Sequence, residues 1–255
     1  MSNKNEVVLY SVDGALARIT LNRPDKRNAL NDELIAQIKE RLSAANQVDS
    51  VRAIVISGAG KDFCSGADLS ALQKIASASV SENLDDARSL MELFLLIRQI
   101  SVPVIAAVQG RALAGGCGLA IACDVVLASS TARFGYPEVK IGFVPAMVLA
   151  ILRRNVSEKH AFELITTGDE IHAVEARQIG LINQVFDDET FSTDVDAYLE
   201  KFSNTSKSAV ELTKRLLYQV DSLAFFEALE SGVDVNVIAR MTEDCQQGIA
   251  KFLKK

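Results

Sequence analysis

The stretch PVIAAVQGRALAGGCGLAIACD (residues 103–124) carries three patterns in succession, those of a buried strand, a glycine-rich loop and an apolar helix. Three glycines, Gly115, Gly116 and Gly118, fall within four positions of the loop. Glycines this close together either allow a turn that other residues cannot make, or allow another group to approach the backbone. On its own, a strand-to-helix turn that needs a positive φ explains the stretch.

A second loop of the same kind, GAGKDFCSGADLS (58–70), follows the apolar run at 51–58 and leads into a helix expected near 68–77. Helix starts leave backbone N–H groups unpaired at the positive end of the helix dipole. Two neighbouring starts would therefore aim two N–H donors at one point, which is the arrangement of an oxyanion hole. Neither loop has the spacing of a dinucleotide fingerprint or of a P-loop.

Strand and helix patterns alternate from the N-terminus to about residue 186, which predicts an α/β fold. Residues 6–22 read as a hairpin around Asp13-Gly14. Residues 81–100 predict a long amphipathic helix capped by Ser81, and residues 31–47 predict another with one apolar stripe. The stripe consists of Leu34, Ile35, Ile38, Leu42 and Ala45.

The last third of the chain is different, because segments 190–203, 205–220 and 222–254 all read as helices. Ala209, Leu212, Leu216 and Leu217 form the apolar stripe of the middle helix. No Pro- or Gly-rich linker separates these helices from the rest of the chain. We interpret them as a helical appendage or assembly surface, with a core at 1–200 and a helical region at 201–255.

The composition, 255 residues with 49% apolar residues and a net charge of −6, is typical of a globular protein. Nonspecific nucleic-acid binding needs a basic face, so the acidic balance argues against that class. The N-terminus lacks signal and transit patterns, and no apolar run is long enough to span a bilayer. We therefore expect a cytoplasmic protein with no membrane or nucleic-acid partner. The cysteines, which we expect to be reduced thiols and not metal ligands, are Cys64, Cys117, Cys123 and Cys245.

Five blocks occur in order with characteristic separations: NRPDKRNALN (22–31), GKDFCSGADL (60–69), the 103–124 stretch, ARFGYPEVKIGFVP (132–145) and GDEIHAVEARQIGLINQVF (168–186). Together they resemble the enoyl-CoA hydratase/isomerase, or crotonase, family over nearly the whole chain. The resemblance implies a core that is a spiral of ββα units. It also implies a C-terminal helical region that forms homotrimers, often paired into hexamers, and an acyl-CoA thioester ligand. No cofactor is implied beyond the coenzyme A of the substrate.

The resemblance also implies catalytic roles. The two oxyanion donors map to the backbone N–H groups of Ala67 and Gly115. Hydratases of the family use two glutamates, of which one maps to Glu138 and the other to Gly118, which has no side chain. Glu138 is therefore the candidate general acid or base, and its apolar neighbours favour a raised pKa.

One carboxylate suits proton transfer between two carbons, as in the Δ3–Δ2 enoyl-CoA isomerase branch of the family. Hydration stays open if another group holds the water, and His160, His172 and Asp68 are conceivable helpers, although Asp68 suits a helix cap better. A catalytically silent acyl-CoA-binding homologue is the alternative.

The phosphates of coenzyme A need cations, and NRPDKRN supplies a cluster that would otherwise be a solvated surface feature. The resemblance places basic residues of this block against the pyrophosphate, and backbone groups of the second loop on the adenine side. It also implies that the C-terminus reaches the coenzyme A of a neighbouring subunit. The residues implied are Lys26, Arg27, Ser65, Ala67, Phe252 and Lys255.

Overall fold

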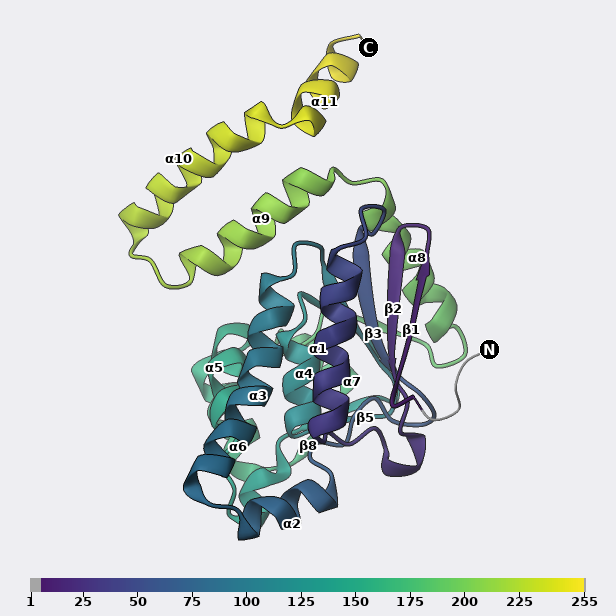
Figure 1. Cartoon of the computed structure of the whole chain (residues 1–255), viewed down its shortest axis with the longest axis vertical. Coiled ribbons are helices and arrows are strands. Elements are labelled where there is room, and N and C mark those ends of the chain that lie inside the picture. The colour runs from purple at the N-terminus through teal and green to yellow at the C-terminus, as the bar shows by residue number, and fades with distance from the viewer. Residues whose placement is uncertain (1–5, 255) are drawn as a thin grey trace.

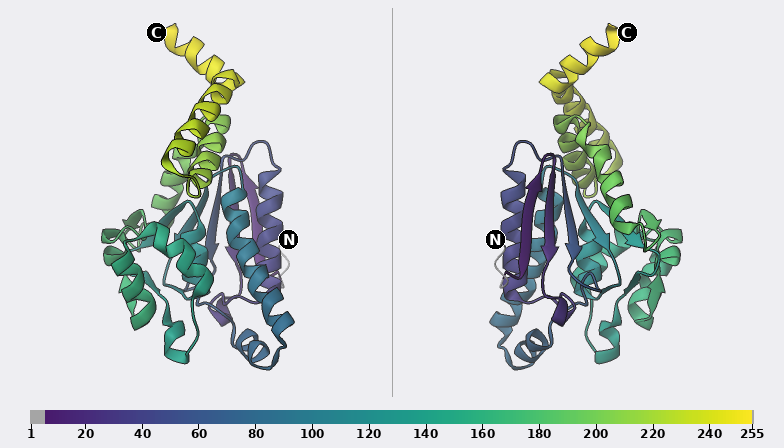
Figure 2. Two further views of the ribbon diagram at one scale, coloured as in Figure 1. Left: turned by 90° about the vertical axis from the view of Figure 1, so that its left-hand side faces the viewer. Right: turned by 90° about the vertical axis from the view of Figure 1, so that its right-hand side faces the viewer.

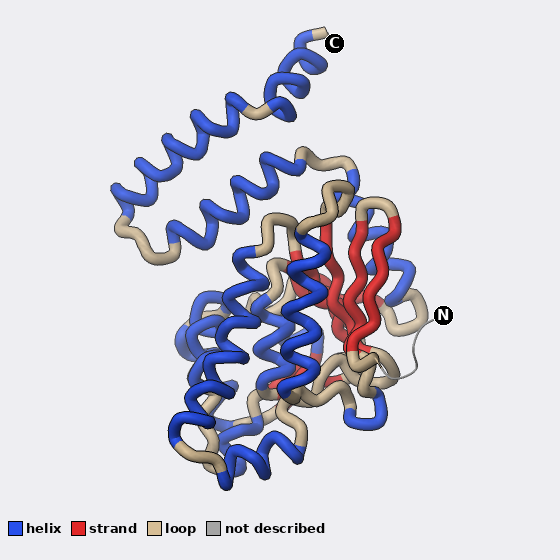
Figure 3. The backbone as a smooth tube through the Cα atoms, viewed as in Figure 1, coloured by secondary structure: helices blue, strands red, loops and turns tan. Residues whose placement is uncertain are grey.

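The computed structural model describes residues 6–254, which form two sheets with helices on both faces of the larger one (Figures 1 and 3). The larger sheet has the order β1-β2-β3-β4-β6-β9, and only the β1–β2 pair is antiparallel. Its strands are β1 (Val8–Asp13), β2 (Leu16–Leu21), β3 (Ala53–Gly58), β4 (Val104–Val108), β6 (Val125–Ser129) and β9 (Gln184–Phe186). The smaller sheet contains β5 (Arg111–Leu113), β7 (Arg133–Gly135) and β8 (Glu170–His172).

The first strands and helix form where the sequence predicts them. The hairpin β1–β2 turns at Gly14, which has a φ of 56° that glycine adopts at little cost. Helix α1 (Asp32–Asn46) begins after Asn31, whose side chain accepts a hydrogen bond from Leu34 N. All five residues of its predicted apolar stripe are buried. They pack against one face of the larger sheet.

The long helix α3 (Val80–Gln99) begins two residues earlier than its predicted cap at Ser81 implies. Ser79, and not Ser81, is its N-cap, and Ser79 and Glu82 form a reciprocal capping box. Helix α2 (Leu69–Ser77) precedes α3, and α4 (Gly115–Ala122) follows β5. Further along the chain lie α5 (Ala146–Asn155), α6 (Glu158–Thr167) and α7 (Ala173–Gln178). The 3-10 helices are η1 (Pro24–Lys26) and η2 (Pro137–Ile141).

The core has one part on each face of the larger sheet. Side chains of α1, α3 and α4 bury one face, and α8 (Phe191–Ser203) covers the other with Val195 and Leu199. We expected residues 190–203 to belong to the C-terminal appendage. That expectation is wrong for α8, because its apolar side chains complete the second face of the sheet. The boundary predicted after residue 200 falls in the last turn of this helix.

The chain ends in helices that project beyond the sheet. Helix α9 (Lys207–Val220) crosses one end of the molecule, and α10 (Phe225–Met241) and α11 (Glu243–Leu253) extend away from it (Figures 1 and 2). The single helix predicted at 222–254 is interrupted at Thr242, which caps α11. In the part of the chain that the structure describes, no helix is long and apolar enough to cross a membrane.

Helix α9 does not bury the stripe that its sequence predicts. Ala209 is exposed and Leu217 is 62% exposed, whereas Lys214 is buried. The Lys214 ammonium pairs with Asp124 at 2.7 Å and donates to the carbonyl oxygens of Ile97 and Val102. Helix α9 also contacts α3, α10 and α11.

Candidate active site

The two glycine-rich loops lie side by side because β5 pairs with the segment that precedes α2. Cys64 N donates to Arg111 O, and Leu113 N donates to Cys64 O, both at 3.0 Å. A Cβ atom added at Gly66 would lie 2.8 Å from Ala114 Cβ, so the loops touch at this point. The segments that carry Ala67 and Gly115 are therefore neighbours in space.

The positive φ of the 112–124 stretch belongs to Ala114 and not to the glycines. Ala114 has φ 51° and ψ −129°, a region that costs about 1–3 kcal/mol for a residue with a side chain. Gly116 serves close approach instead, because a Cβ atom there would lie 2.3 Å from Cys64 O. The Ala114 conformation fixes the direction of the peptide whose N–H belongs to Gly115, the first residue of α4.

Two backbone donors at this junction have no acceptor within residues 6–254. Ala67 N and Gly115 N donate to no backbone or side-chain acceptor in that range. The neighbours of Ala67 are fixed, since Leu30 N donates to Gly66 O and Asp68 N donates to Leu30 O. Gly115 is half-buried at the start of α4, where the helix dipole adds positive potential. An anionic oxygen is the natural acceptor for such a pair.

Glu138 lies at the start of η2, directly after β7 has passed the beginning of α4. Its side chain is half-buried, and its Oε2 atom is buried with no hydrogen-bond donor among the described residues. Burial raises the pKa of the Glu138 carboxyl above its ordinary value. Lys140 is not its partner, because Lys140 pairs with Asp169 at 3.2 Å. The raised pKa makes this carboxyl easier to protonate than an exposed glutamate, which suits a general acid or base.

A buried polar pair lies beside Glu138. The Cys117 thiol of α4 donates to the Tyr136 hydroxyl at 3.2 Å. Burial raises the pKa of both groups, to about 12 for Cys117, and the Glu138 charge adds to the increase. Tyr136 is two positions before Glu138, so this hydrogen bond ties the Glu138 segment to α4. At neutral pH the thiol stays protonated, so Cys117 is not a nucleophile here.

The space beside Gly118 is filled by apolar side chains from two other helices. A Cβ atom at Gly118 would lie 2.5 Å from Val148 Cγ2 on α5 and 3.1 Å from Phe94 Cζ on α3. No larger side chain fits there unless these neighbours move.

The model of the enoyl-CoA hydratase/isomerase family matches residues 11–255. The chain belongs to this family. It is 37% identical over 242 residues to a putative enoyl-CoA hydratase of Thermus thermophilus, with 95% of this chain and 96% of the relative covered. It is 35% identical to the 2,3-dehydroadipyl-CoA hydratase of Escherichia coli, with 93% of this chain and 91% of the relative covered. The enoyl-CoA hydratase structure from Mycobacterium smegmatis superimposes with a TM-score of 0.93 at 30% identity, covering 97% and 96% of the two chains.

Membership in the enoyl-CoA hydratase/isomerase family confirms the crotonase-type α/β fold predicted from the five sequence blocks. It also identifies the chain as an enzyme of the enoyl-CoA hydratase type. The individual site residues named from the sequence stay predictions, and the structure places them as follows.

The cations near the second loop divide into a structural one and two exposed ones. Arg23 is tied down, because its guanidinium pairs with Asp68 and donates to Ala29 O. The Arg23 hydrogen bond lowers the pKa of Asp68, which also accepts from Ser70 N as the cap of α2. Lys26 and Arg27 are exposed, in and directly after η1.

The residues expected on the adenine side lie next to this pair. Ser65 N donates to Arg27 O at 3.1 Å, and Ala67 follows two positions later with an exposed side chain. The structure therefore brings the 22–31 block to the edge of the two glycine-rich loops. Phe252 lies on α11 at the other end of the molecule and is 78% exposed (Figure 1). Lys255 lies outside the described residues.

The conceivable helper groups are engaged elsewhere. His160 Nδ1 contacts the Ser157 hydroxyl at 3.1 Å, and His172 Nε2 contacts the Arg133 guanidinium at 2.9 Å. Asp68 confirms its expected role as a helix cap.

Three features of the site were missed by sequence reasoning. The strained Ala114, the Tyr136–Cys117 pair, and the Val148–Phe94 filling of the Gly118 space all depend on tertiary packing. The apolar segment 143–154 carries a signal for one of them, since Val148 lies in it and points toward Gly118.

Proposed function

We propose that this protein transfers protons on an acyl-CoA thioester through an enolate, with Glu138 as general acid and base. The thioester oxygen would accept hydrogen bonds from the N–H groups of Ala67 and Gly115. The observation that carries the proposal is the half-buried Glu138 carboxyl, whose Oε2 atom has no donor within residues 6–254, beside the helix that begins at Gly115. It supports an active enzyme over a silent acyl-CoA-binding homologue.

The proposed reaction proceeds in two proton transfers. The Glu138 carboxylate removes a proton from a carbon next to the double bond, and the electron pair moves to the thioester oxygen. The two N–H donors and the dipole of α4 stabilise that negative charge, and such donors typically contribute about 10²–10³ each in rate. The protonated Glu138 then returns the proton to another carbon, which shifts the double bond and regenerates the thioester.

The surroundings of Gly118 favour double-bond isomerisation over hydration. Hydration needs a water held by polar groups, and the Gly118 position is walled by Val148 and Phe94. A single carboxylate is enough to move a proton between two carbons. The relatives named as hydratases support the second candidate, hydration of a 2-enoyl thioester with Glu138 as the one carboxylate.

Coenzyme A recognition and assembly belong to the same proposal. Lys26 and Arg27 would contact the pyrophosphate, and the Ser65 and Ala67 backbone would line the adenine side. Phe252 and Lys255 would act on the coenzyme A of a neighbouring subunit, because the chain's own α11 lies far from η1 and α2 (Figure 1). The substrate supplies the coenzyme A, and we infer no further cofactor. The assembly would be a trimer or a pair of trimers.

The test compares Glu138→Gln with the wild type on short 2-enoyl and 3-enoyl thioesters. We expect kcat to fall by about 10²–10⁴, because the amide cannot exchange the proton, while coenzyme A binding is unchanged. Glu163→Gln is the matched control, since Glu163 is exposed on α6 and should leave kcat unaltered. Product analysis separates the shifted double bond from the hydroxyacyl product.

Each outcome is informative. Turnover by Glu138→Gln within about twofold of the wild type would contradict the assignment of Glu138. Wild-type protein that binds coenzyme A but converts neither thioester would support the silent homologue. A hydroxyacyl product alone would replace isomerisation by hydration and leave the role of Glu138 intact.

A further inference from the structure

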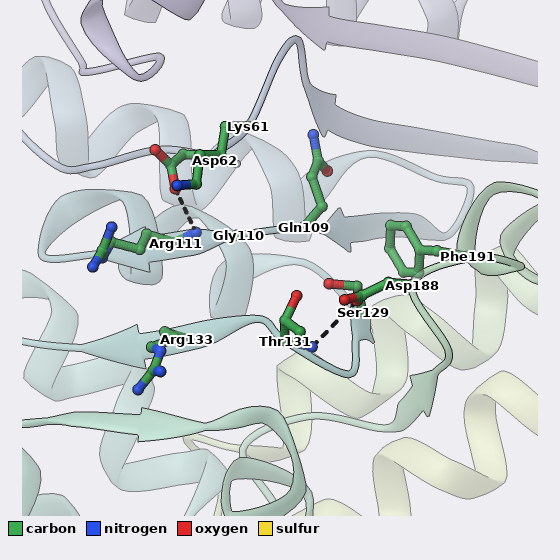
Figure 4. A pocket seen from close by; sticks show the side chains of 10 residues that line it. All are labelled: Lys61, Asp62, Gln109, Gly110, Arg111, Ser129, Thr131, Arg133, Asp188 and Phe191. Atoms are coloured by element: carbon green, nitrogen blue, oxygen red, sulfur yellow. Dashed lines mark hydrogen bonds between the residues drawn. The ribbon is translucent and has the colours of Figure 1, made fainter.

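A pocket of about 400 Å³ lies at the carboxyl ends of parallel strands of the larger sheet (Figure 4). Lys61 follows β3, Gln109 follows β4, and Asp188 follows β9, while Ser129 ends β6. In open α/β sheets, ligands bind in the crevice outside the carboxyl ends of the strands. None of the described residues assigned above to catalysis or coenzyme A lines this pocket. Its location is that of a ligand site, and it is separate from the proposed active site.

Cationic side chains from adjacent strands line one side of the pocket. Arg111 on β5 and Arg133 on β7 are direct partners in the register of the smaller sheet, and both side chains point the same way (Figure 4). Like charges placed directly opposite each other destabilise a sheet. The next residue in the row is His172 on β8, opposite Arg133. The small sheet therefore carries a charge arrangement that a bound anion would stabilise.

The ion pairs within the protein leave part of this positive charge unmatched. Glu170 pairs with Arg111 at 3.4 Å. Arg133 contacts His172 Nε2, which must be the acceptor because a guanidinium only donates. Among residues 6–254, no carboxylate lies within ion-pair distance of Arg133 or of the exposed Lys61.

Two carboxylates also line the pocket, and backbone donors hold both of them. Asp62 is buried, and its Oδ1 accepts from Arg111 N at 3.0 Å. Asp188 Oδ1 accepts from Thr131 N at 3.2 Å, and hydrogen bonds from Thr131 and the neighbouring serines lower its pKa. The backbone N–H donors hold these carboxylates in place and offset part of their negative charge.

We propose that this pocket binds a phosphate group, with Arg111 and Arg133 donating from adjacent strands and Lys61 adding a third cation. The planar guanidinium matches the geometry of phosphate oxygens better than that of a single halide ion. Two sources share this chemistry. One is free inorganic phosphate, and the other is an organic phosphate monoester whose remaining part contacts Phe191 at the other side of the pocket (Figure 4).

The experiment measures binding of inorganic phosphate and of AMP by titration calorimetry of the full chain, at constant ionic strength set with chloride. We expect saturable binding by the wild type and a loss of affinity of about tenfold or more in Arg133→Gln and in Arg111→Gln. If an arginine variant fails to fold, Lys61→Gln takes its place, and it should also lose phosphate affinity. Lys61 is exposed, so this change should not disturb the fold. Far-UV circular dichroism checks the fold of each variant.

Two controls separate the pocket from general charge and from the proposed function. Lys140→Gln removes a cation that pairs with Asp169 outside the pocket, so its phosphate affinity should equal that of the wild type. Glu138→Gln should also bind phosphate as the wild type does, so a failed catalytic assignment would leave this result untouched. Tighter binding of AMP than of phosphate, lost in Phe191→Ala, supports an organic monoester, and equal binding supports free phosphate.

Three results would overturn the proposal. The first is the absence of saturable phosphate binding at constant ionic strength. The second is an equal loss of affinity in Lys140→Gln and Arg133→Gln, which would indicate nonspecific charge. The third is a change in the assembly mass of the arginine variants without any phosphate affinity in the wild type. That result would indicate that Arg111, Arg133 and His172 form a contact between copies of the chain.

Discussion

Glu138 illustrates the conflict between stability and activity at a single residue. Its carboxyl is half-buried and its Oε2 atom has no donor among the described residues, so ionisation is penalised in the folded state. The unfolded chain exposes the same carboxyl to water, where the ordinary pKa of 4.5 applies. The folded state therefore binds this proton more tightly than the unfolded state does.

The pH dependence of stability should reveal this carboxyl. Because the folded pKa is raised, its contribution to stability is complete below about pH 4.5 and is lost as pH rises through the folded pKa. Glu138→Gln has no such group, so it should gain melting temperature relative to the wild type over that pH range. Calorimetric scans of both proteins from about pH 4 to pH 8 measure the difference. A difference that does not change with pH would show that Glu138 ionises equally in both states.

The site residues that the sequence predicted belong to recognisable motifs, whereas those that it missed depend on tertiary packing. Glu138, Ala67 and Gly115 could be named because each belongs to a block of recognisable letters. The φ of Ala114 could not, since alanine gives no local signal for a positive φ. The strain there is imposed by contacts that the 112–124 stretch makes with the other loop, and those contacts are absent from the linear pattern.

At the scale of elements, Gly118 shows how three helices share one volume. Helix α4 approaches α5 and α3 so closely that a Cβ atom at Gly118 would lie 2.5 Å from Val148 Cγ2. We expect Gly118→Ala to lower the free energy of unfolding by about 1–3 kcal/mol through overpacking. Val148→Ala removes the contacted methyl group, so the double variant should be more stable than the sum of the single changes predicts.

Urea unfolding of the two single variants and the double variant measures this coupling. Gly248→Ala is the matched control, because a Cβ atom at Gly248 in α11 meets nothing within 4 Å. That change should stabilise the helix by about 0.5–1 kcal/mol. Additive effects within about 0.5 kcal/mol would mean that the Gly118 and Val148 positions do not compete for space.

Helix α9 shows that apolar periodicity can predict a helix without predicting which of its sides faces the core. Its spacing of apolar residues identified a helix correctly, but not which side faces the core. Lys214 turns toward the sheet because its ammonium finds three acceptors there, Asp124 and two carbonyl oxygens. The Asp124 carboxylate also accepts from the Tyr218 hydroxyl at 2.7 Å. This hydrogen-bond network forms only when the strands and α3 are in place, so the local sequence of α9 does not predict it.

At the scale of the whole molecule, the five blocks predicted the fold because their order and separations cover residues 22–186, which contain most of both sheets. The sheet and its helices follow that order. The C-terminal helices lie outside the blocks, and here five large apolar side chains are more than two thirds exposed. The exposed fractions are 81% for Phe225, 68% for Phe226, 78% for Met241, 78% for Phe252 and 78% for Leu253. Monomeric proteins rarely leave so much apolar surface uncovered.

Assembly through this arm follows from the exposed apolar surface. We expect the wild type to sediment as a trimer or a pair of trimers of the 27.6 kDa chain at micromolar concentration. Phe226→Glu places a charge in the apolar surface of α10, and burying that charge between copies is unfavourable, so the variant should sediment as a monomer. Glu230→Gln, an exposed change on the same helix, should keep the wild-type mass. A wild-type protein of 27.6 kDa, or a Phe226→Glu variant with the wild-type mass, would contradict assembly through α10. The variant should retain its far-UV spectrum, because Lys214 and Tyr218 fasten α9 to the core independently of any partner.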